Sequence, residues 1–308
     1  MIGIEAIGSY LPGSKIDNLS RYSLFNTDRE FISSKIGFET LPRKAPLEET
    51  SDLCVSAWEK LQKNANCSIK EVELIVICTQ NPDNYGLPQT SAIVQHKLGC
   101  SDTVAAFDIS LGCSGYIYGL EIVKSFMDAN GMHKGLFFTA DPYSKIMNPE
   151  NKNTELLFGD AATCTLLSRT PRYSILKSQF ATDGTDSDAI QRSSSDGTLE
   201  MNGQKVFMFV MKKVPRQIQN CLQLNKLNQN DIDIFLFHQG SKFMVEMLRS
   251  RLSLAEHQAP FLAHKTGNTV SSSIPLALQA IQNKKYTHIL LSGFGVGLSW
   301  ATTIIKQQ

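Results

Sequence analysis

Six short runs of apolar and β-branched residues recur along the chain, and helix-like segments separate them. Runs that stay apolar on both faces are typical of buried strands in a sheet that helices cover on both sides. The pattern therefore predicts an α/β fold. The predicted strands are 74–79, 104–110, 135–141, 162–168, 233–239 and 288–295, and the predicted helices are 51–63, 114–130, 203–224, 241–254 and 271–283.

Two other features refine this outline. Pro215 predicts a break or kink within the helix-like segment 203–224, because proline lacks the amide hydrogen and clashes with the preceding turn. Residues 182–199 are polar and rich in turn formers, so we expect a surface excursion there.

Similar segments lie about half a chain apart. SIKEVELIVICTQN at 68–81 resembles LNQNDIDIFLFHQG at 227–240, since each has a polar start, an acidic pair and an apolar strand. GLFFTAD at 135–141 corresponds in the same way to HILLSGFG at 288–295. The spacing predicts two similar α/β halves.

Charge and cysteine content exclude several classes of function. The chain has 30 basic and 29 acidic residues, so its net charge of +1 gives no support to nucleic-acid binding. Seven cysteines without a CxxC pair argue against a disulfide framework and a zinc site. No apolar run reaches the roughly 18–20 residues of a membrane-spanning helix, and the first residues do not resemble a signal peptide. We expect a cytoplasmic protein with free thiols and no membrane insertion.

One cysteine stands where a predicted strand becomes a predicted helix, in FDISLGCSGYIYGL at 107–120. The first amides and the dipole of a helix lower the pKa of a nearby thiol, so Cys113 is a candidate thiolate nucleophile. Gly112 and Gly115 would give a substrate access to the sulfur, and nearby N–H groups could form an oxyanion hole. The alternative is a cysteine packed at a tight turn.

Two polar residues follow later elements of the predicted sheet. Open parallel sheets place reactive groups beyond the carboxyl ends of their strands, where His238 closes an apolar run and Asn268 lies in a Gly-Asn-Thr turn. A structural histidine and a turn asparagine are the alternatives, and His264 rivals His238. Cysteine, histidine and asparagine together can handle a carbonyl group. The same order occurs in papain-like proteases, but their sequence context around the cysteine is absent, so a cysteine hydrolase stays a weaker alternative.

The motifs together resemble the β-ketoacyl-acyl-carrier-protein synthase III family. They are IGSYLP at the N-terminus, SKIGFE, GCSG around Cys113, FGDAAT, HQGS beginning at His238, GNTVSSSIPLAL around Asn268, and GFGVGLSW near the C-terminus. The resemblance runs almost end to end and implies a thiolase-like fold, in which two similar halves form layers of helix, sheet, helix, sheet and helix. It implies a nucleophilic cysteine in residues 1–168, and the histidine and asparagine in residues 169–308.

The resemblance also implies a reaction. Cys113 would take an acyl group from a thioester, with the backbone N–H groups of Cys113 and Val296 as oxyanion hole. His238 and Asn268 would bind the carbonyl of malonyl-acyl carrier protein and stabilise the enolate formed on decarboxylation, which attacks the acyl-cysteine to give a β-ketoacyl product. Donation from His238 Nε2 predicts a structural acceptor on Nδ1 or another suitable environment. No metal or redox cofactor is required, and acyl carrier protein, coenzyme A thioesters and a second copy of the chain are the expected partners.

Several substrate-binding positions depart from the family pattern. Phe31 replaces a tryptophan that stacks on adenine, and Lys35 and Lys152 replace arginines, so planar stacking and bidentate phosphate contacts are lost. Ser241 replaces an asparagine. We expect weakened recognition of the adenine nucleotide and an acyl donor bound to a carrier protein or otherwise unusual.

Three further positions bear on the acyl pocket. Leu87 corresponds to a residue that the dimer partner inserts into that pocket, and its small bulk favours chains longer than acetyl. Val296 replaces a glycine, and valine resists a positive φ. Phe294, in the same motif, is a further candidate substrate-binding residue. An acyltransferase of the same fold that acts on a hydroxyl or amine without condensation is the main alternative function, and a binding protein that retained the fold is the last.

Overall fold

The computed structural model describes residues 1–65 and 67–308. Its main sheet follows the strand order β12-β13-β14-β8-β1-β7-β6-β4-β5, and β9 pairs with β14. All six strands predicted from the apolar runs are present, whereas β1, β8, β9 and β14 were missed. The strands are β1 (Gly3–Tyr10), β4 (Leu74–Cys78), β5 (Ala105–Ile109), β6 (Lys134–Ala140), β7 (Ala162–Ser168), β8 (Tyr173–Ile175), β9 (Gln179–Thr182), β12 (Ile234–Phe237), β13 (His288–Gly295) and β14 (Ser299–Gln307).

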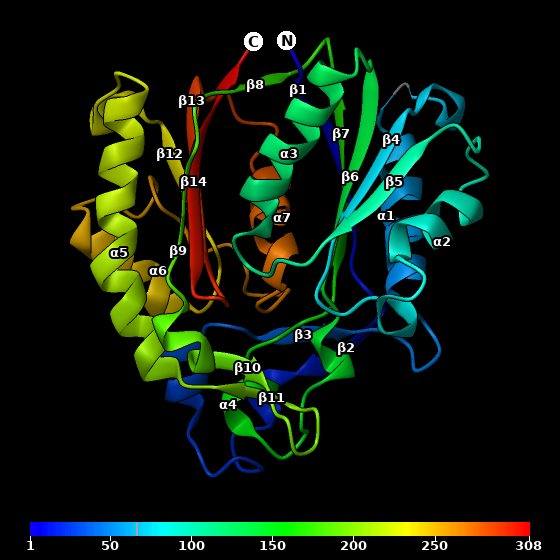
Figure 1. Cartoon of the computed structure of the whole chain (residues 1–308). Coiled ribbons are helices and arrows are strands. Elements are labelled where there is room, and N and C mark those ends of the chain that lie inside the picture. The colour runs from blue at the N-terminus through cyan, green and yellow to red at the C-terminus, as the bar shows by residue number, and fades with distance from the viewer. Residues whose placement is uncertain (66) are drawn as a thin grey trace.

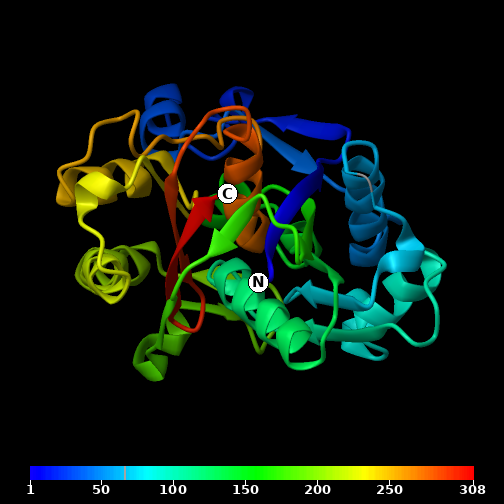
Figure 2. The ribbon, with the colours of Figure 1, turned by 90° about the horizontal axis from the view of Figure 1, so that it is seen from above.

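Helices divide the molecule into layers (Figure 1). The helices are α1 (Thr50–Gln62), α2 (Thr90–Lys97), α3 (Gly115–Ala129), α4 (Lys152–Glu155), α5 (Gly203–Leu224), α6 (Lys242–Arg251) and α7 (Ser273–Ala280). α3 and α7 lie between the two parts of the sheet, α1 and α2 cover one outer face, and α5 and α6 lie outside the other, as Figure 2 also shows. The predicted layered thiolase-like fold is confirmed. No helix in the described part of the chain has the length and apolar character needed to cross a bilayer.

The predicted similarity of the two halves extends to local structure. β4 pairs in parallel with β6, and β12 pairs in parallel with β13. Before each first strand lies a single 3-10 turn that opens with a capping box, formed by Ser68 with Glu71 in one half and by Asn228 with Asp231 in the other. The short strand β8 pairs with both β1 and β14 and so joins the two parts of the sheet. A boundary between residues 168 and 169 stays a prediction.

Two sequence expectations about single segments were correct only in part. The expected break at Pro215 is absent: α5 runs through this residue, because its buried face packs on β13 and β14 and offsets the missing hydrogen bond, whereas a kink stays a prediction. Residues 182–199 are not only a surface excursion: part of the segment forms the hairpin of β10 (Ile190–Arg192) and β11 (Leu199–Met201). Ile190 and Leu199 of this hairpin are buried in the cluster that contains Cys113.

A small second layer covers one end of the main sheet. It is the end at which β5 and β12 lead into Cys113 and His238. The layer contains the β2 (Ser14–Asp17) and β3 (Thr40–Arg43) pair, the β10–β11 hairpin and α4, which lie together at the bottom of Figure 1. The π-helical turn η2 (Phe31–Ile36) contacts α6 nearby. These elements supply the walls above the strand ends.

Candidate active site

Cys113, His238 and Asn268 line one cavity of about 410 Å³. Cys113 lies between β5 and the first residue of α3, and His238 comes directly after β12. Asn268 is held by a bridge to Phe158, in which its N–H donates to the Leu157 carbonyl at 2.8 Å and its carbonyl accepts from the Gly159 N–H at 3.0 Å. The structure thus brings the three predicted residues together from distant parts of the chain.

The glycines around Cys113 serve the packing of the protein. A Cβ on Gly115 would lie 2.3 Å from the Cys78 sulfur, and one on Gly112 would lie 2.6 Å from a Val296 methyl group. That these glycines also give a substrate access to the sulfur stays a prediction. Gly295 comes closest to the thiol, since a Cβ there would lie 2.8 Å from Cys113 Sγ.

The Cys113 thiol is protonated in this environment. Burial, followed by the negative charge of nearby Asp141, raises the pKa of Cys113 to about 12. The backbone N–H groups of Cys113 and Val296 act in the opposite direction because they donate toward the sulfur. The predicted thiolate is therefore wrong for the free site, since burial outweighs the favourable amides.

Val296 occupies its position without strain. It is not among the residues with positive φ, whereas its neighbour Gly297 has a φ of 136°. The local backbone therefore suits a valine, and the Val296 N–H still faces Cys113. Phe294, two residues earlier, packs edge-on against the His238 ring, with 5.6 Å between the ring centres.

His238 is neutral, and a serine hydroxyl lies beside its Nδ1. Only 3 % of the residue is exposed, and burial lowers the pKa of the imidazole to about 3. Nδ1 lies 2.7 Å from Ser273 Oγ, which already accepts the Gln239 N–H at 3.3 Å. The serine hydroxyl can donate to Nδ1, which leaves the proton on Nε2. A serine hydroxyl that can donate to Nδ1 is a suitable environment for donation from Nε2, which was the second of the two expectations.

The Asn268 side chain is oriented by the turn that follows it. Its Oδ1 accepts the Val270 N–H at 2.9 Å, so the Nδ2 group is the one left to donate to a ligand. Val270 has a φ of 53°, which is unusual for a β-branched residue. Strained backbone of this kind is often found where a functional side chain is held in place.

The sequence analysis missed Asp141, which lies directly after β6 and is fully buried. Its carboxylate accepts the Gln80 N–H at 2.7 Å and the Ser271 hydroxyl at 2.5 Å. Burial raises the pKa of Asp141 to about 6. Its position as the last residue of the apolar run 135–141 was the only signal in the sequence.

The mouth of the cavity is aromatic. Phe31 and Lys35 of η2 line it together with Phe207 and Phe243. The rings of Phe207 and Phe243 stack on one another at 5.5 Å, and Lys35 Nζ lies 4.6 Å from the centre of the Phe243 ring. Phe207 and Phe243 are therefore already engaged by protein side chains, whereas Phe31 stays partly exposed.

The other predicted substrate-binding residues lie at different distances from the cavity. Ser241 lines it, and its hydroxyl also caps α6 by accepting the Met244 N–H. Lys152 lines an adjoining hollow of about 340 Å³ that shares Phe31 with the main cavity. Leu87 does not line the cavity and is 85 % exposed.

His264 does not compete with His238. It packs edge-on against Phe261, with 4.7 Å between the ring centres, and it does not line the cavity. All seven cysteines are free. Among the residues that the structure describes, no three His, Cys, Asp or Glu side chains gather as metal ligands would.

A buried Cys-His-Asn site at the strand ends of a layered α/β fold defines a thiolase-type protein. The sequence profiles described as 3-oxoacyl-(acyl-carrier-protein) synthase III and its C terminal part match residues 107–184 and 222–307. The chain belongs to the 3-oxoacyl-acyl-carrier-protein synthase III family.

Individual relatives cover the whole chain. It is 34 % identical to the β-ketoacyl-acyl-carrier-protein synthase III of Caldanaerobacter subterraneus subsp. tengcongensis, over 99 % of this chain and 97 % of the relative. It is 32 % identical to the enzyme of that name from Clostridioides difficile, over 99 % and 98 %. The solved structure of the Thermus thermophilus β-ketoacyl-acyl-carrier-protein synthase III superposes with a TM-score of 0.92 at 29 % identity, covering 99 % of both chains.

Proposed function

We propose that this protein catalyses the decarboxylating condensation of an acyl thioester with malonyl-acyl carrier protein through an acyl-Cys113 intermediate. The observation that carries the proposal is the shared cavity of a buried thiol, a neutral histidine and an asparagine whose free amide group is a donor. Family membership supports the same reaction, since the relatives are named for it.

In the first half-reaction, Cys113 Sγ attacks the thioester carbonyl of the donor. The backbone N–H groups of Cys113 and Val296 stabilise the oxyanion, as their approach to the sulfur supports. The C–S bond of the donor then breaks, and the departing thiolate takes the proton that Cys113 loses. Because the free thiol has a high pKa, this proton transfer has to accompany the attack.

In the second half-reaction, the carbonyl of the malonyl thioester accepts hydrogen bonds from His238 Nε2–H and Asn268 Nδ2–H. Two donors on one oxygen stabilise the enolate that forms as CO₂ leaves. The enolate carbon attacks the acyl carbonyl, a C–C bond forms, and the Cys113 thiolate leaves and regains a proton. A neutral histidine suits this role, since the donor keeps its proton throughout.

The side chains at the mouth of the cavity favour an acyl donor bound to acyl carrier protein over a coenzyme A thioester. Phe207 and Phe243 stack on each other, and the ammonium of Lys35 lies over Phe243. A lysine does not bind phosphate with the planar, bidentate geometry of arginine. Equal or better acylation of Cys113 by the coenzyme A thioester would contradict this preference.

We also propose a homodimer in the cytoplasm. β5 ends the main sheet, with no strand in the described part of the chain paired to its outer side, and an open edge of this kind is a ready surface for a second copy. Tyr85 and Leu87 are 91 % and 85 % exposed, which is unusual for large apolar side chains and supports a covered surface there. Sedimentation velocity would test this: a monomer at micromolar concentration contradicts it.

The decisive experiment is intact-mass analysis after incubation with acyl thioesters, followed by addition of malonyl-acyl carrier protein. We expect one acyl adduct, lost in Cys113→Ala, and release of CO₂ with a β-ketoacyl product in the second step. Acylation followed by transfer to a hydroxyl or amine without CO₂ release would favour the acyltransferase alternative. Adducts that only hydrolyse would indicate a cysteine hydrolase.

A further inference from the structure

We propose that Arg43, the last residue of β3, is a positioning residue for Asn268. Arg43 does not line the catalytic cavity. It acts through Phe158, because its guanidinium binds the Phe158 carbonyl and Phe158 forms the bridge that holds Asn268. The inference deepens the proposed condensation and rests on Asn268 as a donor to the malonyl thioester.

The main chain of Asn268 is bonded on both sides of Phe158. Its N–H donates to the carbonyl of the residue before Phe158, and its carbonyl accepts the N–H of the residue after it. The Asn268 side chain follows this main chain, because its Oδ1 is bonded in turn to the Val270 N–H. The direction of the Nδ2 donor therefore depends on the position of Phe158.

The Phe158 carbonyl is bound by Arg43. Nη1 of the guanidinium donates to this carbonyl, and Nη2 lies 3.3 Å from the Glu155 carboxylate and 3.4 Å from the Glu155 carbonyl. Phe158 is 3 % exposed, so little water can reach its carbonyl to replace a lost donor. The guanidinium thus ties the end of α4 and the Phe158 bridge to β3.

The guanidinium is itself held in place. The Glu155 oxygen that Arg43 contacts also lies 3.0 Å from Nη2 of Arg21. The side chains of Arg21, Arg43 and Glu155 are 15 %, 12 % and 8 % exposed, and ion pairs with so little exposure are weakly screened by salt. Arg43 therefore reaches Phe158 from a fixed position.

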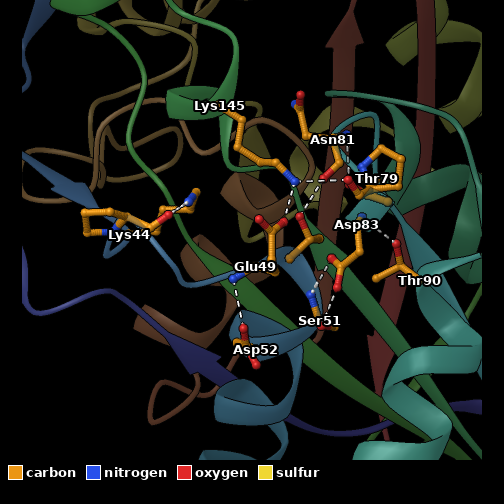
Figure 3. A network of polar contacts seen from close by, with 12 residues as sticks. Lys44, Glu49, Ser51, Asp52, Thr79, Asn81, Asp83, Thr90 and Lys145 are labelled. Atoms are coloured by element: carbon orange, nitrogen blue, oxygen red, sulfur yellow. Dashed lines mark hydrogen bonds and ion pairs between the residues drawn. The ribbon is translucent and has the colours of Figure 1, made fainter. Parts of the chain in front are cut away.

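The segment after Phe158 has anchors that do not involve the guanidinium. The Asp160 carboxylate accepts the Lys44 N–H at 2.9 Å and the Ser144 hydroxyl at 2.5 Å. Lys145, the residue after Ser144, contacts Glu49 at 2.7 Å in the network that Figure 3 shows. Removal of the guanidinium should therefore shift the bridge locally and leave the rest of the fold in place.

The test measures two rates for each protein, the acylation of Cys113 and the decarboxylation of malonyl-acyl carrier protein. In Arg43→Met, we expect kcat for decarboxylation to fall by about 10–100-fold, because a misplacement of about 1 Å can cost about 100-fold. Acylation should change by less than about threefold, since Asn268 is not part of the oxyanion hole for that step. A merely structural role of Arg43 would lower both rates together.

Two further variants sharpen this test. Arg172→Met is the matched control, because Arg172 also donates to a main-chain carbonyl, that of Gln282, and does not line the cavity. It should leave both rates unchanged. Arg43→Lys keeps the positive charge beside Glu155 but lacks the two-nitrogen fork, so we expect a selective loss of decarboxylation of less than about tenfold.

An equal fall of both rates in Arg43→Met, or no fall in either, overturns the inference. If that variant does not fold, Arg43→Lys takes its place, and a wild-type ratio of decarboxylation to acylation in it overturns the inference equally. A wild-type protein that forms no acyl adduct and releases no CO₂ overturns the proposed function and this inference together. Wild-type activity in both steps, with the same ratio in the Arg43 variants, overturns this inference alone.

Discussion

The floor and the mouth of the cavity are built by different means. On the floor, Cys113, His238 and Asn268 are 7 %, 3 % and 6 % exposed, and their placement depends on strand ends and buried hydrogen bonds. At the mouth, Phe31 is 40 % exposed and Lys35 lies over a ring. Under the proposed function, we expect a change on the floor to disturb the chemistry, and a change at the mouth to alter the choice of donor and leave the fold intact. The difference would allow the family chemistry to persist while Phe31 and Lys35 depart from the family pattern.

The largest expected effect is on the floor. Asn268→Asp keeps the oxygen that accepts the Val270 N–H but replaces the Nδ2 donor by an acceptor. We expect malonyl decarboxylation to fall by about 10²–10³-fold, as when one oxyanion donor is removed, while Cys113 acylation persists. Release of labelled CO₂ and intact mass measure the two steps.

His264→Ala is the matched control for the floor, because that histidine does not line the cavity. It should leave both steps unchanged. Loss of acylation and decarboxylation together in Asn268→Asp would show that the asparagine maintains the fold of the site and not the enolate.

The next effect concerns the charge behind the nucleophile. Asp141 is the second cause, after burial, of the raised pKa of Cys113. A raised thiol pKa means that the thiolate forms only as pH rises toward about 12, so removing the anion must move the rise in reactivity to lower pH. At pH 8 we expect iodoacetamide to alkylate Cys113 faster in Asp141→Asn than in the wild type, by a factor of up to about ten. A pKa that is lower by one unit raises the fraction of thiolate tenfold.

The pH profile of Cys113 alkylation, followed by peptide mass spectrometry, measures this shift. Cys100 in the same protein is an internal control, since burial alone raises the pKa of its thiol. A profile that stays in place, or moves to higher pH, would contradict the electrostatic role of Asp141.

The sequence was sufficient to predict which residues meet on the floor of the cavity, because each lies in a motif next to the end of a predicted element. Cys113, His238 and Asn268 each follow or precede a run whose apolar pattern is readable locally. The features of the site that the sequence did not predict depend on long-range packing. The Ser273 partner of His238 and the burial that raises the Cys113 pKa depend on elements that meet only in the folded chain.

The β10–β11 hairpin teaches the same lesson. Its polar turn residues led to the expectation of a surface excursion, yet Ile190 and Leu199 are buried next to Cys113. Two apolar residues in a polar stretch are too few to give a periodic signal. Such a hairpin contributes to the site only because the end of the sheet lies beneath it.

A smaller effect is expected at the mouth. Phe31→Trp with Lys35→Arg returns two positions to the family pattern, and arginine can stack and bind phosphate with two hydrogen bonds. We expect acylation by a coenzyme A thioester to improve about three- to fivefold, a modest gain of the size expected for an exposed cation–π or phosphate contact. Acylation from acyl carrier protein should stay the same, and the ratio of the two rates measures the change. Equal gains with both donors would place the effect on the floor and not at the mouth.

The smallest effect is expected at Val296, which lies between the floor and the mouth of the cavity. Val296→Gly restores the glycine of the family motif, and if the valine distorted the oxyanion hole, acylation should rise sharply. Val296 has no positive φ and its N–H already faces Cys113, so we expect the acylation rate to change by less than about twofold. Loss of the methyl contact at the Gly112 turn should instead lower stability by about 1 kcal/mol, measured by thermal unfolding. A large gain in acylation with unchanged stability would show that the backbone of the hole, and not only the mouth, has diverged in this chain.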